Sequence, residues 1–131
     1  MDDIIFPGFV NIREYLAGID FTLLTSLSEG QPYAILESMA SGLPLIATDV
    51  GSCRSLIEGD DHDRFGEAGI CVTPMHQGEM LEALIEMCEY PGLRRQMAKA
   101  GRERVKAYYN IDGMIKNYQD VYQKAIAKWQ A

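Results

Sequence analysis

The sequence predicts an α/β protein built on a parallel, Rossmann-like sheet, with helices forming its C-terminal part. Apolar segments rich in strand formers alternate with segments whose apolar residues recur at helical spacing. The segment DFTLLTS is apolar on both faces, which is typical of a strand buried inside a parallel sheet. Alternation of strands and helices implies right-handed crossovers between parallel strands. The 131 residues, 47% hydrophobic and 24% charged, suffice for one domain with a sizeable core.

The first elements are short. Residues 4–6 (IIF) form an apolar run that stops at Pro7-Gly8, and we expect a strand there. Residues 11–18 are predicted to form a short helix with Asn11 as its N-cap, because an asparagine side chain can accept a first-turn amide. Residues 20–26 (DFTLLTS) are expected to form a strand buried in the sheet.

The central elements are marked by proline and glycine. Pro32 suits the first position of a helix, where its missing N–H costs nothing, and we expect that helix to end at Gly42. Residues 45–48 give the next strand. Gly51-Ser52 then opens a short helix over residues 53–58.

The remainder of the chain is mainly helical. An acidic loop over residues 59–69 leads into the last predicted strand, residues 70–74. Apolar residues at helical spacing then predict three helices, over residues 77–90, 92–108 and 111–129. These helices are interpreted as packing on the sheet.

The net charge of −7 narrows the range of partners. Acidic residues outnumber basic ones by 19 to 12, and an acidic surface repels a phosphate backbone, so we expect no nucleic-acid partner. The apolar runs fall well short of the ~20 residues that a membrane span requires. The N-terminal stretch lacks the features of a signal peptide. A small anionic ligand fits only a site built from local dipoles.

The cysteines and histidines indicate neither disulfides nor a metal site. Cys53, Cys71 and Cys88 are odd in number and dispersed, which favours free thiols in a reducing compartment. We therefore predict a cytoplasmic location. His62 and His76 lack ligand-like spacing, and the acidic residues around His62 match no calcium-loop pattern. No metal is expected.

Two glutamates stand out, one in the loop after the strand 20–26 and one on the following helix. Ligands of open parallel sheets bind outside the carboxyl ends of the strands, and the loop that contains Glu29 lies there. First-turn amides, here those of Tyr33, Ala34 and Ile35, lack intrahelical partners and can hold a phosphate. One carboxylate can accept both hydroxyls of a vicinal diol, so Glu29 and Glu37 could flank a ligand with sugar, diphosphate and ribose parts. In the alternative interpretation, Glu29 only caps the dipole of the following helix, and Glu37 is a solvated surface residue.

The helix that begins near Pro32 is expected to have two different faces. Its apolar side, directed at the sheet, consists of Ile35, Leu36, Met39 and Leu43. Glu37 lies on a separate stripe with Tyr33 and Ser41, at the preceding and following fourth positions. Small residues beside that stripe allow a flat ligand to approach the backbone.

This segment resembles the signature of family 4 retaining glycosyltransferases, which have the GT-B architecture. Their C-terminal domain carries two glutamates separated by seven residues, here EGQPYAILE, followed by SMASGLPLIATDVGS. The segments FPGFV, IDFTLLTS and GICVTP are similar to flanking elements of the family. The resemblance implies that residues 1–131 are part of a GT-B C-terminal domain that lacks its first strand–helix units, and that the chain alone is inactive.

The resemblance also implies the roles of site residues. Glu29 would contact the donor sugar and is the catalytic candidate, and Glu37 would bind the ribose diol of a UDP-sugar. Donor binding falls on neighbouring residues: Gly30, Gln31, Tyr33, Ala34, Ile35, Leu36 and Glu37. The backbone amides from Gln31 to Ile35, except that of Pro32, would meet the sugar and the diphosphate. Neither a metal nor a cofactor is required, because the leaving phosphate accepts the proton of the acceptor.

The segments SEGQP, VGSCRSLIEG and DRFGEAGI are similar to those of a branch of the family that uses UDP-glucose in exopolysaccharide synthesis. The partners implied are a UDP-sugar and the missing N-terminal part of the same protein. The strand 20–26 would have an open edge, through which the chain could form a homodimer.

Two other interpretations remain open. Nucleotide-sugar 2-epimerases share the architecture, but they need carboxylates and a histidine from regions outside this chain. A non-catalytic interaction module would bind no UDP and would present an apolar patch to a partner. A dinucleotide-binding dehydrogenase is disfavoured, because no GxGxxG motif follows any predicted strand.

Overall fold

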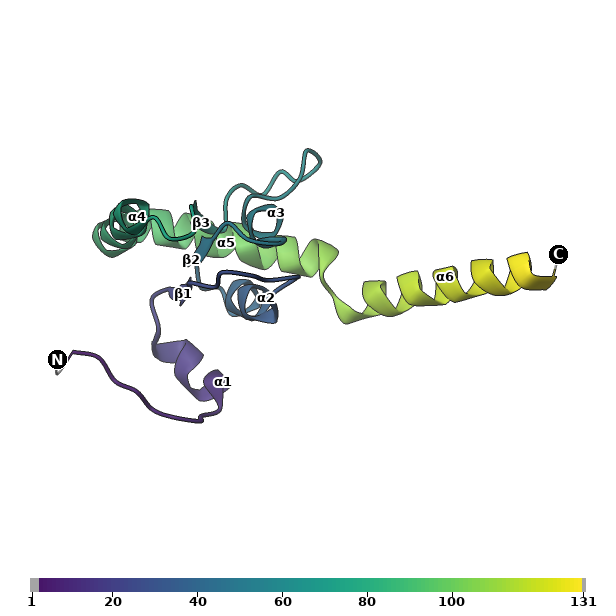
Figure 1. Cartoon of the computed structure of the whole chain (residues 1–131), viewed down its shortest axis with the longest axis horizontal. Helices are drawn as coiled ribbons and strands as arrows, with labels where there is room; N and C mark the ends of the chain where they lie inside the picture. Colours follow the sequence, from purple (N-terminus) through teal and green to yellow (C-terminus); the bar gives the residue numbers. More distant parts are fainter. Residues whose placement is uncertain (1–2, 131) are drawn as a thin grey trace.

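Three parallel strands in the order β1–β2–β3 form the sheet, and helices pack on both of its faces (Figure 1). The computed structural model describes residues 3–130. The strands are β1 (Thr22–Leu24), β2 (Leu45–Thr48) and β3 (Gly69–Val72). The helices are α1 (Ile12–Tyr15), the 3-10 turn η1 (Leu16–Gly18), α2 (Tyr33–Ala40), α3 (Cys53–Glu58), α4 (Gln77–Glu89), α5 (Pro91–Tyr108) and α6 (Ile111–Gln130). The predicted α/β class with a parallel sheet is confirmed.

The register of the sheet brings the carboxyl ends of its strands to one edge. Thr22 lies opposite Leu45, and Leu45 lies opposite Gly69, so the three strands advance in step. The loops that follow β1 and β2, residues 25–32 and 49–52, therefore leave the sheet at the same edge. An open parallel sheet binds its ligands at this edge.

The central strand β2 separates two hydrophobic clusters. Successive side chains of a strand point to opposite faces. Leu45 and Ala47 pack in a cluster with residues of α2 and α3, whereas Ile46 packs with residues of α4. Helix α5 contributes to both clusters, with Val105 near its end on one face and Met97 near its start on the other. The sheet is thus fixed between two helical layers.

Helix α2 is defined by its two ends. Pro32 is the N-cap, with extended backbone angles (φ −73°, ψ 119°), so the first helical residue is Tyr33 and the prediction that Pro32 occupies the first turn is wrong by one position. At the other end Gly42 has a positive φ of 73°. The amide of Leu43 donates to the Ser38 carbonyl (3.0 Å), which together with the left-handed glycine makes a Schellman motif. The predicted stop at Gly42 is confirmed.

The predicted strand over residues 4–6 is absent. These residues have no regular secondary structure, and the side chains of Ile5 and Phe6 are 84% and 87% exposed. A short apolar run becomes a strand only when a neighbouring strand accepts its backbone hydrogen bonds, and none pairs with it among the described residues. The helix predicted over residues 11–18 is present as α1 and η1, and the Asn11 side chain caps it by accepting the Arg13 amide (3.3 Å).

Strand β1 differs from the expectation of a buried strand. It is shorter than predicted and lies at the edge of the sheet, paired only with β2. Leu23, at its centre, is 47% exposed. Within residues 3–130 the other edge of β1 has no partner strand.

Helix α6 extends away from the sheet (Figure 1). None of its described residues is buried. Its large apolar side chains all remain exposed: Ile111, Met114, Ile115, Tyr118, Val121, Tyr122, Ile126 and Trp129. The expectation that this helix packs on the sheet is therefore wrong. Its 20 residues correspond to about 30 Å of helix with an uncovered apolar side.

Candidate functional site

Glu29 lies in the loop after β1 and is oriented by a serine at the end of that strand. The Ser26 hydroxyl donates to Oε1 of Glu29 (2.6 Å). Ser26 is in turn fixed to the central strand, because the hydroxyl of Thr48 donates to the Ser26 carbonyl. Thr48 is the last residue of β2 and is buried. The glutamate is therefore linked through Ser26 to the buried end of the central strand.

The loop after β2 holds the Glu29 loop from the other side. Both the backbone amide and the hydroxyl of Ser52 donate to the Gly30 carbonyl, over 3.0 and 2.8 Å. Gly51 has a positive φ of 56°, and a Cβ at this position would lie 2.0 Å from the Glu29 carbonyl oxygen. Only glycine permits this close approach of the two backbones.

The start of α2 offers fewer free amides than the sequence suggested. The amides of Tyr33 and Ala34 have no backbone acceptor in the described part of the chain. The amide of Ile35, by contrast, donates to the Pro32 carbonyl (3.2 Å), so the expectation that it is free is wrong. Two unpaired amides and the helix dipole remain for an anion.

The side chains of α2 follow the two predicted faces. Tyr33 and Glu37 are exposed, and so is Ser41 at the end of the same stripe. Ile35 is 1% exposed and belongs to the core, and its amide is already paired with Pro32. Leu36 is half-buried against the same core.

The predicted site residues lie on two sides of α2. Gln31, Tyr33 and Leu36 line a cavity of about 450 Å³ together with residues around the α5–α6 junction: Tyr108, Tyr109, Asn110, Ile111, Met114, Asn117 and Tyr118. Glu37 lines a different cavity of about 490 Å³, next to Arg13 of α1. Glu29 lines neither. Ala34 and Ile35 line a third cavity of about 340 Å³, again with Glu37. The described residues therefore do not bring the predicted site residues together in one cavity.

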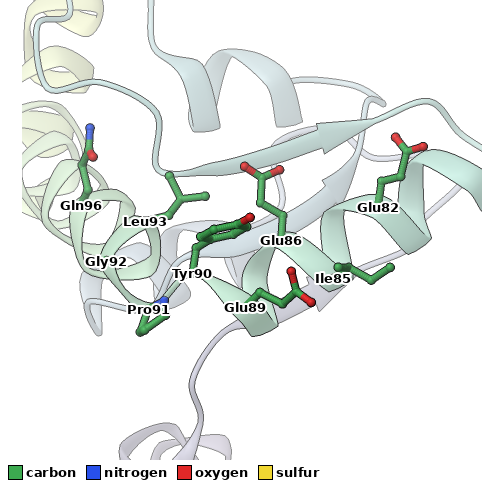
Figure 2. A pocket seen from close by; sticks show the side chains of 9 residues that line it. All are labelled: Glu82, Ile85, Glu86, Glu89, Tyr90, Pro91, Gly92, Leu93 and Gln96. Atoms are coloured by element: carbon green, nitrogen blue, oxygen red, sulfur yellow. The ribbon is translucent and has the colours of Figure 1, made fainter.

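A further cavity, of about 790 Å³, lies elsewhere. It is formed where α4 meets α5, and Figure 2 shows Tyr90 and three glutamates around it: Glu82, Glu86 and Glu89. Helix α4 starts after β3 at the carboxyl edge and runs back along the sheet, so its last turn lies toward the opposite edge. This cavity is consequently separate from the Glu29 loop.

Positive charge near the Glu29 loop is already paired. Arg54 forms ion pairs with Asp49 (2.7 Å) and with Glu58, and the hydrogen bond to Asp49 raises the pKa of the guanidinium. No lysine or arginine lines the cavity that contains Gln31 and Tyr33. An anion held by the described residues at this position would depend on amides and the helix dipole.

The comparisons with known proteins identify the family. A family model described as "Glycosyl transferases group 1" matches residues 1–90. The chain belongs to this family. The predicted resemblance is therefore confirmed at the level of the family.

Two curated relatives show what kinds of protein this chain is similar to. The chain is 29% identical over 113 residues to an MMP alpha-(1->4)-mannosyltransferase from Mycolicibacterium hassiacum, which covers 86% of the chain and 26% of the relative. It is 30% identical over 112 residues to an N-acetyl-alpha-D-glucosaminyl L-malate synthase from Bacillus anthracis, with coverage of 86% and 28%. The chain thus spans between a quarter and a third of these relatives' length.

A solved structure confirms the fold of this glycosyl transferase chain. The sucrose-phosphate synthase from Thermosynechococcus elongatus superposes with a TM-score of 0.85 at 24% identity, covering 97% of this chain and 31% of the synthase. The sheet and the helices around the Glu29 loop therefore follow an arrangement that also occurs in this synthase.

Three site residues were missed by the sequence analysis: Ser26, Thr48 and Ser52. Thr48 and Ser52 act through hydrogen bonds to residues 22 positions away, which depend on how β1 pairs with β2. A serine three positions before Glu29 was the one local signal, because such a hydroxyl can reach the carboxylate.

The described residues offer neither a metal-binding cluster nor a membrane-spanning helix. Within residues 3–130, no group of three or more His, Cys, Asp or Glu side chains could hold a metal ion. In the same range, every helix is too short or too polar to cross a membrane.

Proposed function

We propose that this chain is the donor-binding part of a retaining glycosyltransferase of GT-B architecture. The reaction would be transfer of a hexose from a nucleotide sugar, UDP-glucose in the first instance. The observation that supports the proposal is the position of Glu29 in the loop that leads from the carboxyl end of β1 to α2, followed by Glu37 on the exposed side of that helix, in a chain of the group 1 glycosyl transferase family.

The proposed roles divide between the two carboxylates and the start of α2. Glu29 would accept hydroxyls of the donor sugar and act as the catalytic residue, and Glu37 would accept both hydroxyls of the ribose. The two unpaired amides, of Tyr33 and Ala34, would donate to the diphosphate. Gly30 and Gln31 lie between Glu29 and the helix, where the backbone can approach the sugar.

The proposed donor site has contributions from side chains of different kinds. Leu36 and Tyr33 supply apolar surface in the cavity beside the α5–α6 junction. Ile35 is buried and would contribute only by fixing the backbone at the start of α2. The proposal requires neither a metal nor a cofactor, because the leaving phosphate itself accepts the proton of the acceptor hydroxyl.

The acceptor and the rest of the donor site would come from other parts of a longer polypeptide. We propose that residues 1–131 lack the first units of the domain, and that the chain alone transfers no sugar. Its relatives are three to four times longer, in agreement with this view. The segments SEGQP, VGSCRSLIEG and DRFGEAGI resemble the branch that contains PelF, so a cytoplasmic role in exopolysaccharide synthesis is proposed.

The proposal is tested by comparing two glutamates in the full-length polypeptide. Replacing Glu37 by alanine removes a charged acceptor of two hydroxyls, and each such bond contributes about 1.5–3 kcal/mol. We expect Glu37→Ala to weaken UDP-glucose binding at least about a hundredfold in isothermal titration, since two such bonds are lost. Glu103→Ala is the matched control, since Glu103 is an exposed glutamate on α5. Equal affinities for both variants would refute the ribose contact.

The uncovered apolar side of α6 favours one alternative, that of a non-catalytic interaction module. That module would bind no UDP-sugar. The same titration distinguishes the two functions. If the full-length protein shows no heat of binding with UDP-glucose or with UDP, the result supports the interaction module.

A further inference from the structure

Ser26 makes a direct contact with the carboxylate that the proposed function places at the sugar. The distance of 2.6 Å between Ser26 Oγ and Glu29 Oε1 is typical of a hydroxyl that donates to an ionised carboxylate. The bond occupies Oε1 and leaves Oε2 without a partner in the described residues. The serine thus fixes one oxygen of the carboxylate and leaves the other for a ligand.

Ser26 itself is held in place. Its carbonyl accepts the hydroxyl of Thr48, a residue that is 4% exposed at the end of the central strand. The serine is half-buried, between the end of β1 and the Glu29 loop. A donor anchored in this way keeps its direction, which a mobile surface serine would not.

The backbone of the Glu29 loop has an anchor independent of the Ser26 side chain. Ser52 donates twice to the Gly30 carbonyl, immediately after Glu29. Removing the Ser26 hydroxyl therefore leaves this anchor intact and releases only the carboxylate. The two functions, holding the loop and orienting the carboxylate, are carried by different residues.

We propose that Ser26 is a positioning residue for Glu29, which orients the carboxylate toward the hydroxyls of the donor sugar. This inference rests on the proposed function, since it assigns a partner to the proposed catalytic residue. It requires that Ser26 influences recognition of the sugar and not of the nucleotide.

The test compares the affinities of the full-length polypeptide for UDP-glucose and for UDP. We expect Ser26→Ala to weaken UDP-glucose binding about tenfold, the lower end of the effect of one lost hydrogen bond to a charged group, and to leave UDP binding unchanged. Ser26→Thr keeps the hydroxyl and should restore the affinity. Ser55→Ala is the control, since Ser55 is an exposed serine whose hydroxyl bonds only within the first turn of α3.

A double-mutant cycle with Glu29→Ala decides whether Ser26 acts through the glutamate. If it does, Ser26→Ala causes no further loss once Glu29 is alanine. An equal loss in both backgrounds would overturn the inference, because it would indicate a general structural role. Full affinity of Ser26→Ala, beside a weakened Glu29→Ala, would overturn it while leaving the proposed function intact. Full affinity of Glu29→Ala would refute the role of Glu29 and the inference with it.

Discussion

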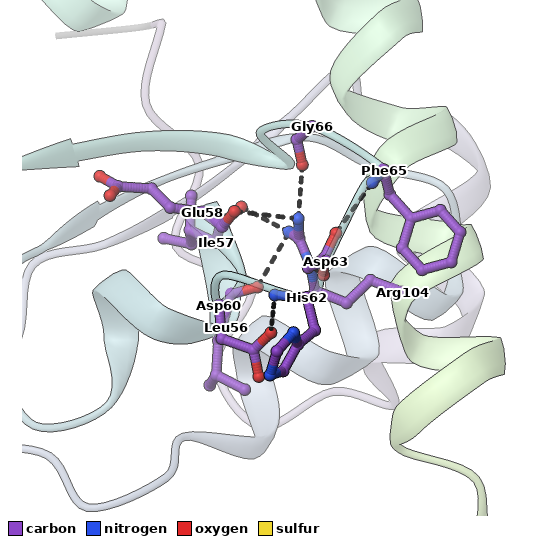
Figure 3. A network of polar contacts seen from close by, with 9 residues as sticks. All are labelled: Leu56, Ile57, Glu58, Asp60, His62, Asp63, Phe65, Gly66 and Arg104. Carbon is purple, nitrogen blue, oxygen red and sulfur yellow. Dashed lines mark hydrogen bonds and ion pairs between the residues drawn. The ribbon is translucent and has the colours of Figure 1, made fainter.

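Arg104 of α5 and Asp63 in the loop after α3 form an ion pair that is almost completely buried. Their side chains are 1% and 2% exposed, and Arg104 Nε donates to Oδ2 of Asp63. Figure 3 shows that the same guanidinium also donates to four carbonyls around it: those of Leu56, Ile57, Glu58 and Gly66. One side chain thus joins α5 to the end of α3 and to the acidic loop. Without Arg104, the buried carboxylate of Asp63 would lose its charged partner.

The first prediction is a large loss of stability in Arg104→Met. Methionine fills similar volume but leaves the Asp63 carboxylate unpaired and buried, and breaking such a pair costs about 3–5 kcal/mol. Chemical denaturation of the 131-residue chain should show this decrease in the free energy of unfolding. Arg95→Met, on the exposed side of the same helix, should change it by less than about 0.5 kcal/mol. Equal midpoints for both variants would contradict the structural role of Arg104.

A second prediction concerns acid. The hydrogen bond from Arg104 holds the pKa of Asp63 below its ordinary value. The unfolded chain, in which aspartate titrates near about 3.9, then binds more protons than the folded chain at acidic pH. The stabilisation is therefore complete above the unfolded pKa and is lost as the pH falls through the lower, folded pKa.

Asp63→Asn isolates this effect, because asparagine does not titrate. We expect the variant to be less stable at neutral pH and to lose less further stability between about pH 5 and 2 than the unmodified chain. Denaturation midpoints measured across that range provide the check. Parallel pH profiles for the two proteins would show that Asp63 contributes nothing to acid unfolding.

The sequence predicted local structure well where local rules act. Helix α2 ends at Gly42 and helix α1 starts after Asn11, because both ends are fixed by one residue and its own neighbours. The role of Arg104 could not be predicted, since it lies in the highly charged segment RRQMAKAGRERVK, where a solvated arginine is the ordinary expectation.

The candidate site was predictable only in part, for a physical reason. The position of Glu29 at the carboxyl edge follows from the order of strand and loop. Its contact with Thr48 through Ser26 depends on the pairing of β1 with β2, which joins residues 22 positions apart. The prediction of a strand over residues 4–6 was wrong for a similar reason. A strand requires a neighbouring strand to pair with, and the residues of the strand itself do not reveal whether one is present.

A third prediction tests the close approach of the two loops. Gly51→Ala places a Cβ 2.0 Å from the Glu29 carbonyl oxygen, on a residue with positive φ. The left-handed backbone alone costs about 1–2 kcal/mol, and the Glu29 loop must also move. We expect a loss of stability larger than this and, in the full-length polypeptide, weaker binding of UDP-glucose.

Gly8→Ala is the matched control for Gly51→Ala. Gly8 also has a positive φ, of 74°, but no atom lies within 4 Å of an added Cβ. It therefore reports the backbone strain without the contact. If the two variants lose equal stability, the approach of Gly51 to Glu29 is not a constraint on the fold.

A fourth prediction follows from the three thiols. Burial raises the pKa of the Cys71 thiol to about 12 and also raises that of Cys53, which is fully buried. Cys88 is exposed on α4. Because the thiolate is the reactive form, Ellman's reagent at pH 8 should modify one thiol of the native chain rapidly and three in denaturant. Cys88→Ser should abolish the rapid phase, and two rapid thiols in the native chain would contradict the burial of the others.

The last prediction concerns the open edge of the sheet. Strand β1 pairs only with β2, so its other side offers unpaired backbone groups that a second chain could bind. We expect the 131-residue chain to form dimers whose fraction rises with concentration in analytical ultracentrifugation. Leu23→Lys places a charge on the half-exposed centre of β1 and should shift the chain to the monomer, because charged residues on an edge strand oppose strand addition.

Two controls identify the surface involved in such a dimer. Leu81→Lys adds the same charge at an exposed leucine of α4 and should leave the dimer unchanged. A chain that ends at Asn110 lacks α6 and its uncovered apolar side. If this shorter chain is monomeric while Leu23→Lys still dimerises, α6 is the interface and the edge of β1 is not. A strictly monomeric mass for the unmodified chain at every concentration would refute self-association through either surface.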